Sequence, residues 1–212
     1  MRTRLIGFAG LLLVQVGAAA MQATLDPRAV GDAVALGQSR GERERARFHM
    51  PYRLIVSRAP VDFVEVVTPF RRIVLEAEAR AQTGDRSFGQ RQAIELLGSG
   101  PATLDVLVEM TFHPLHTFVG VPDYGVTLVA RGMPAVTPRA VDRVPRHGPR
   151  VAGAPLSNPR AIPVPSDQPM VGGSMVAHFD VQVLNPLGRY DVVIDEAGKE
   201  LARAPLDLAR MR

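Results

Sequence analysis

Short runs in which apolar and polar residues alternate recur through the second half of the chain, and two more lie earlier. Successive side chains of a β-strand point to opposite faces, so this alternation predicts half-buried strands. The predicted strands are residues 52–59, 61–68, 102–112, 124–130, 174–180, 189–195 and 199–208. Residues 195–198 join the last two as a predicted hairpin, in which Gly198 supplies a positive φ.

Three segments instead repeat apolar residues every three to four positions, which predicts helices. The first covers residues 25–37, where Asp26 is a good N-cap and Pro27 fits the first helical position. The second and third together span about residues 69–97. Thr68 caps the second helix and Gly84 ends it, and Gly98 ends the third, whose start Ser87 and Gln90 mark by their capping-box spacing. This pair is predicted to be a helical insertion between strands.

Two segments carry neither period. Residues 38–49 are polar and rich in arginine, which favours a solvated linker, with binding to an anionic surface as the alternative. Residues 132–170 hold nine of the 18 prolines. Proline cannot donate to a β-ladder, so this stretch cannot supply central strands. It is predicted to be a long loop along a sheet edge, with one short strand at residues 150–153.

A local pattern, Leu184-x-Pro186-x-x-x-Tyr190, stands just before a predicted strand. It resembles the tyrosine corner of fibronectin type III and related immunoglobulin-like sandwiches, where the tyrosine hydroxyl bonds to the backbone of the preceding loop. The resemblance covers about the last forty residues. The fold it implies is mainly β: an immunoglobulin-like β-sandwich with a helical insertion and an N-terminal helix. In general character the chain also resembles exported bacterial proteins, which implies no activity.

The first twenty residues have the pattern of an export signal. Arg2 and Arg4 precede an apolar run at residues 5–16, and the alanines at 18–20 suit a signal peptidase. The run is shorter than a membrane span, although an uncleaved anchor helix is the alternative. We therefore expect a periplasmic or secreted protein whose mature chain has no transmembrane segment and begins at Met21 or Thr24. The predicted divisions are 1–20, 21–47 (helix and charged linker) and 48–212 (β-sandwich).

Composition narrows the chemistry. The chain has no cysteine, which excludes disulfides, thiol catalysis and cysteine-bound zinc. Loss of Arg2 and Arg4 with the signal leaves 23 basic and 21 acidic residues, a net charge of +2. Such a balance gives no reason to expect a nucleic-acid partner.

One stretch, residues 110–126, suggests a metal site. His113 and His116 lie three positions apart and Asp123 follows. Residues three apart on a strand face opposite sides, and Pro114 disfavours a helix. Only a turn beginning at Pro114 brings the two histidines together, and three such ligands then hold zinc with one position open. The simpler interpretation is a polar connection from a strand to a turn. We expect no cofactor.

Nucleophilic catalysis has little basis in the sequence. Ser174, His178 and Asp180 lie close along the chain, but a strand places the first two on one face, too far apart for a hydrogen bond. Arg143, Arg146 and Arg150 of the proline-rich stretch are the candidate binding residues for an anionic or protein partner. The predicted function is a non-catalytic interaction or assembly module, and the alternative is a metal-dependent hydrolase or metal binder at His113, His116 and Asp123.

Overall fold

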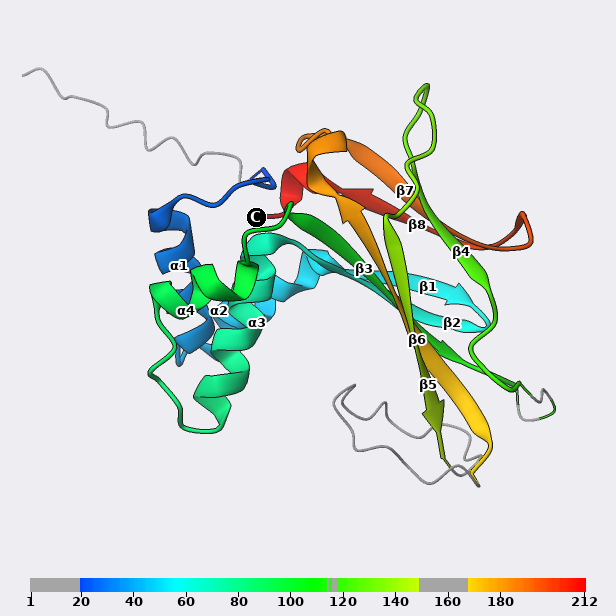
Figure 1. Cartoon of the computed structure of the whole chain (residues 1–212), viewed down its shortest axis with the longest axis horizontal. Helices are drawn as coiled ribbons and strands as arrows, with labels where there is room; N and C mark the ends of the chain where they lie inside the picture. The colour runs from blue at the N-terminus through cyan, green and yellow to red at the C-terminus, as the bar shows by residue number, and fades with distance from the viewer. Residues whose placement is uncertain (1–19, 114, 116–117, 149–167) are drawn as a thin grey trace, which may run out of the picture.

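The computed structural model describes residues 20–113, 115, 118–148 and 168–212, and it consists of two β-sheets with a group of helices at one end (Figure 1). Helix accounts for 30% and strand for 38% of the structure. The fold is therefore mixed, and the mainly β prediction holds only in part. The immunoglobulin-like arrangement stays a prediction.

The larger sheet has five antiparallel strands. In spatial order they are β1 (Arg53–Arg58), β2 (Val61–Val67), β3 (Thr103–Thr111), β6 (Met170–Asp180) and β5 (Ala140–His147). β3 shows why the strands form where the alternation predicts them, because Leu104, Val106, Val108 and Met110 are buried while the residues between them are only partly covered.

The smaller sheet has three antiparallel strands in chain order. They are β4 (Tyr124–Val129), β7 (Arg189–Glu196) and β8 (Lys199–Asp207). The predicted hairpin between the last two is confirmed, with Gly198 at a φ of 81°. Buried residues of both sheets, such as Val108, Phe179 and Ile194, belong to one hydrophobic core between their inner faces.

Four α-helices gather at one end of the strands (Figure 1). They are α1 (Pro27–Gln38), α2 (Glu42–His49), α3 (Pro69–Gln82) and α4 (Gln90–Leu97). A second core joins α1, α3 and α4, where Gly37 lets α1 approach Ala77 so closely that a Cβ at this position would collide. The predicted caps are present on α1 and α3: Asp26 and Thr68 accept hydrogen bonds from the N–H groups of Ala29 and Arg71.

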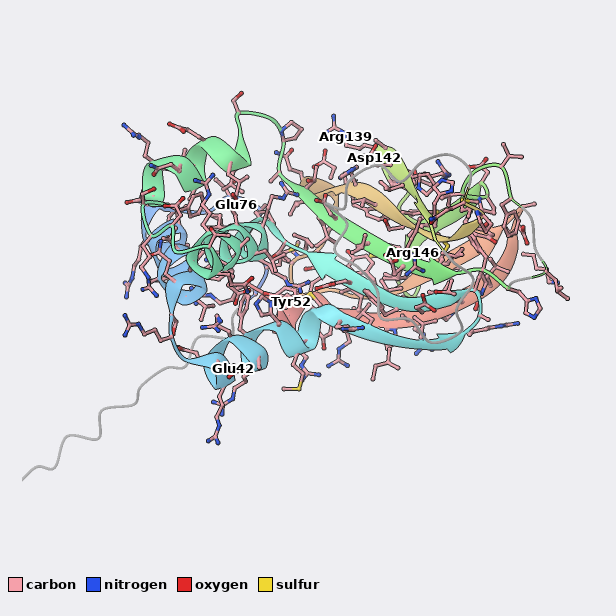
Figure 2. All side chains as sticks on the ribbon, turned by 90° about the horizontal axis from the view of Figure 1, so that it is seen from below. Glu42, Tyr52, Glu76, Arg139, Asp142 and Arg146 are labelled. Carbon is pink, nitrogen blue, oxygen red and sulfur yellow. The ribbon has the colours of Figure 1, made fainter. Side chains whose placement is uncertain are left out.

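Three short 3₁₀ helices complete the fold: η1 (Met50–Tyr52), η2 (Val181–Val183) and η3 (Leu208–Arg210). Tyr52 lies at the junction between helices and strands (Figure 2). Its hydroxyl donates to the Arg212 carbonyl oxygen at 3.1 Å and accepts from the Arg212 N–H at 2.9 Å, while Thr68 also donates to that carbonyl. The last residues of the chain are thereby held against both layers.

Arg71 of α3 is only 2% exposed and lies at the same junction. It donates to the Val66 carbonyl oxygen and pairs with Glu65 of β2, and its guanidinium stacks on Tyr52. It also donates to His49 at the end of α2. One buried cation, neutralised and hydrogen-bonded, thus ties the helices to the five-stranded sheet.

Three predictions differ from the structure. Residues 42–49 form α2 rather than an irregular linker, although no residue of α2 is buried. Residues 140–147 of the proline-rich stretch form β5, which was not predicted, but β5 lies at a sheet edge, where proline is tolerated. Gly89 rather than Ser87 caps α4, since its N–H donates to Gln92. The strand predicted at residues 150–153 lies outside the described residues.

The described helices include none that combines the length and the apolar character needed to cross a bilayer. Residues 1–19, which carry most of the predicted export signal, lie outside the described residues. The export prediction therefore stays a prediction.

Candidate functional site

The candidate metal residues have other partners where they are described. Nδ1 of His113 accepts a hydrogen bond from the Leu115 N–H at 3.2 Å, and Asp123 pairs with Arg143 at 2.5 Å. His116 lies outside the described residues. Within the described part of the chain, no three histidine, aspartate or glutamate side chains are placed to hold a metal ion. The metal site stays a prediction that these contacts do not favour.

The candidate binding arginines of β5 are engaged inside the protein. Arg143 contacts Asp123 and donates to the Tyr124 carbonyl oxygen, which connects the edge of the large sheet to the start of β4. Arg146 reaches across β6 to β3, where it donates to the Met110 carbonyl oxygen and the Thr111 hydroxyl. Arg150 lies outside the described residues. The two described arginines therefore have local structural contacts.

Gly172 explains the path of Arg146. A Cβ at Gly172 would collide with the Arg146 guanidinium, so glycine lets the side chain lie flat over β6. Arg146 also approaches Glu109 at 3.7 Å. Burial raises the pKa of Glu109 above its ordinary value, and Asp62 adds to the rise although Arg146 opposes it. The Arg146 Nε is buried with no hydrogen-bond partner in the described structure.

His178 is a bridge between strands rather than a base for Ser174. Its Nδ1 contacts Asp105 of β3 at 2.8 Å and its Nε2 contacts Asp142 of β5 at 3.2 Å. Asp105 in turn pairs with Arg72 of α3. Burial lowers the pKa of His178, but the hydrogen bonds and charges of the two carboxylates outweigh it and raise the pKa above its ordinary value. Both ring nitrogens thus have carboxylate partners across the sheet.

Tyr190 makes the contact that the Leu184-x-Pro186-x-x-x-Tyr190 spacing predicts. Its buried hydroxyl accepts a hydrogen bond from the Asn185 N–H at 2.8 Å. Gly188 permits the close packing, since a Cβ there would collide with the Tyr190 ring. The family resemblance that suggested this contact remains a prediction.

The surface feature that sequence analysis missed is a groove of about 540 Å³ between β1 and β8. We call it the β1–β8 groove. Its lining residues are Arg47, Met50, Pro51, Arg53, Leu54, Ile55, Pro205 and Arg210. Met50 and Ile55 are 68% and 86% exposed, which is high for large apolar side chains. These side chains gather with arginines around one groove, which makes the groove a candidate binding surface.

The charged side chains that line the β1–β8 groove in the described structure are all positive. Arg47 comes from α2, Arg53 from β1 and Arg210 from η3, and none of the described residues that line the groove is acidic. None of the three arginines has a carboxylate within ion-pair distance in the described structure. Arg45, also on α2, differs because it pairs with Glu78 at 3.2 Å. Arg53 stacks over the Phe63 ring at 4.1 Å, which orients its side chain.

β1 differs from the other outer strands in how its outer side is covered: β8 lies beside it but forms no backbone hydrogen bond with it in the described structure. β5 carries Pro145 and β8 carries Pro205, and proline blocks pairing with another strand. On the edge of β4, Leu128 exchanges both backbone hydrogen bonds with Val136. β1 has no proline, and among the described residues no further backbone segment bonds to its outer side. Its regular part, Arg53–Ile55, lines the β1–β8 groove.

A local pattern pointed to part of this site. The arginine-rich residues 38–49 suggested an anionic partner as an alternative, and Arg47 belongs to them. Arg210 is more than 150 positions away and joins the groove only because β8 folds beside β1. A reading of local patterns could not bring these segments together.

Comparison of the chain with protein-family models, with curated protein sequences and with solved structures gave no match. The site must therefore be interpreted from its own geometry.

Proposed function

We propose that the protein is a non-catalytic interaction module of the periplasm or cell exterior and that it binds a segment of another protein in the β1–β8 groove. The observation that carries the proposal is the coincidence of a strand edge that is unpaired in the described structure with exposed apolar side chains in one groove. Natural sheets normally block such edges because they pair with other chains.

The recognition mode follows from the geometry. An extended segment laid beside β1 forms backbone hydrogen bonds with the outward N–H and C=O groups of the strand. Its alternate side chains then face the groove, where Ile55 and Met50 offer apolar contact. Backbone pairing supplies affinity without regard to sequence, and the groove supplies the selectivity.

Site-specific photo-crosslinking in cells that produce the protein tests this proposal. A photoreactive residue at Ile55 is expected to give a discrete protein adduct. The matched control is the same residue at Leu187, which is 60% exposed and lies outside the groove. Equal adduct patterns at the two positions, or none at Ile55, would contradict the proposal.

Export is a separate part of the proposal, supported by the pattern of residues 1–20. Met21 is buried in the core between the sheets, and its N–H donates to the Leu208 carbonyl oxygen at 3.4 Å. Cleavage before Met21 keeps these contacts, whereas cleavage before Thr24 removes them. N-terminal sequencing of protein from the extracytoplasmic fraction is expected to begin at Met21. Full-length protein in the cytosol would refute export.

A further inference from the structure

We infer that the segment bound in the β1–β8 groove carries acidic residues, at least one of them two positions from an aliphatic residue. This inference rests on the proposed function and specifies the chemistry of the partner. Backbone pairing along β1 does not involve the side chains of Arg47, Arg53 and Arg210, and the acidic residues of the bound segment give these arginines a partner.

The charge of the groove is local. The whole chain is nearly balanced, with 25 basic and 21 acidic residues, and many of its arginines pair with carboxylates. Arg47, Arg53 and Arg210 converge on one groove without such a partner in the described structure. Carboxylates of a bound segment would supply the missing counter-charges, and arginine suits them because its planar group donates two parallel hydrogen bonds.

The spacing follows from β-strand geometry. Arg53 and Ile55 stand two positions apart on β1, so their side chains point to the same face. A strand paired with β1 places one residue opposite each of them, and these two residues are again two positions apart. An acidic residue opposite Arg53 and an aliphatic residue opposite Ile55 match both side chains. Arg47 and Arg210 can take a second acidic residue from the same segment.

Two other occupants fit less well. A second copy paired through β1 would bring its own arginine-lined groove and no carboxylate among the described lining residues, and like charges brought together across strands are destabilising. Single-stranded nucleic acid binds through aromatic side chains that stack on bases, and none of the described lining residues is aromatic. An acidic peptide segment agrees with the charge, the apolar contacts and the free edge together.

The test begins with selection from a random display library of peptides about seven residues long, enough to pair with all of β1. The bait is the full chain. The enriched peptides are expected to contain two or more acidic residues, with an acidic and an aliphatic residue two positions apart. The leading peptide and its amide version, with every Glu changed to Gln and every Asp to Asn, are then compared by fluorescence anisotropy. We expect binding about tenfold weaker for the amide version, since each of several exposed ion pairs contributes modestly.

Variants locate the effect. A triple variant of the groove is expected to weaken binding of the acidic peptide to a similar extent; it combines Arg47→Ser, Arg53→Ser and Arg210→Ser. The control changes Arg28, Arg86 and Arg131 to Ser; these residues are exposed and lie outside the groove, so it removes the same charge. Control binding should equal that of the unchanged protein. Both variants should keep the melting temperature, because the altered side chains are at the surface.

The outcomes separate the two proposals. Selection that enriches no peptide would overturn the proposed function and this inference together. Enriched peptides without acidic residues, or binding that the groove variant leaves unchanged, would overturn only the acidic chemistry. Binding to phosphatidylglycerol vesicles that depends on the groove arginines, with no peptide binding, would assign the groove to a lipid surface and overturn both.

Discussion

The two outer strands of the five-stranded sheet both carry arginines, but they use them differently. On β5, Arg143 contacts Asp123, and Arg146 reaches Glu109, Met110 and Thr111. On β1, Arg53 belongs to a groove in which no described lining residue is acidic. Figure 2 labels Arg139, Asp142 and Arg146 on the β5 side. Arginines at the two strand edges are therefore not equivalent. Those of β5 bind carboxylates and carbonyl groups of neighbouring segments, whereas Arg53 of β1 has no ion-pair partner in the described structure.

The largest expected difference between the edges is in stability. Arg146→Ala removes hydrogen bonds to Met110 and Thr111 and leaves the half-buried Glu109 without its cation, so it should lower the free energy of unfolding by about 2–3 kcal/mol. Arg210→Ala at the β1–β8 groove removes no ion pair in the described structure and should change it by less than about 0.5 kcal/mol. Urea unfolding curves measure both values. Equal losses of unfolding free energy in the two variants would show that the arginines of the two edges contribute equally to stability.

Tyr190→Phe, which lies on neither β1 nor β5, provides a reference for these stability differences. Tyr190→Phe removes the hydroxyl that accepts the Asn185 N–H, and it should cost about 1–2 kcal/mol because that buried donor loses its partner. Peptide binding at the groove should not change. If urea melts of Tyr190→Phe and the unchanged protein coincide, the hydrogen bond has no energetic importance. If peptide binding falls with unchanged stability, the groove extends further than described.

A smaller expected difference between the two edges is the pH dependence of stability that His178 produces. The raised pKa of His178 means that the protonated ring favours the folded state, held between Asp105 of β3 and Asp142 of β5. This contribution is complete below the ordinary histidine pKa of about 6.5 and is lost as pH rises through the higher folded-state pKa.

We therefore expect urea midpoints to fall between about pH 6 and about pH 8 more steeply in the unchanged protein than in His178→Gln. Asp105 also pairs with Arg72 of α3, so the carboxylate that contacts His178 has a second cationic partner. Arg210→Ala, at the other edge, should keep the slope of the unchanged protein. A slope that survives His178→Gln would show that another group controls it.

Local physics explains which parts of the fold were predictable. β3 was predicted because its alternate residues are apolar, and α3 because Thr68 caps an amphipathic run that Gly84 follows. α2 was missed because none of its residues is buried and no apolar face marks it. β5 was missed because it is largely exposed and contains Pro145, which is tolerated only at an edge.

The candidate site was less predictable than the fold. Arg143 and Arg146 were predicted to bind a partner because they are basic residues in a loop-like stretch, and that binding stays a prediction. Their contacts in the structure lie at the start of β4 and on β3, which no local pattern indicates. Arg53 and Arg210 drew no prediction, since their role depends on the absence of acids around a groove built from distant segments. Strand register decides which charges are neutralised, and one-dimensional patterns do not contain it.

Hydrogen exchange of the full chain, with and without the selected acidic peptide, shows whether a bound segment pairs with β1. A segment added to β1 must form hydrogen bonds with outward amides of that strand and slow their exchange. We expect new protection confined to β1 and the adjacent part of the β1–β8 groove, with exchange in β5 unchanged. Protection at β5, or no protection at β1 when the peptide is bound, would contradict the assignment of the binding surface.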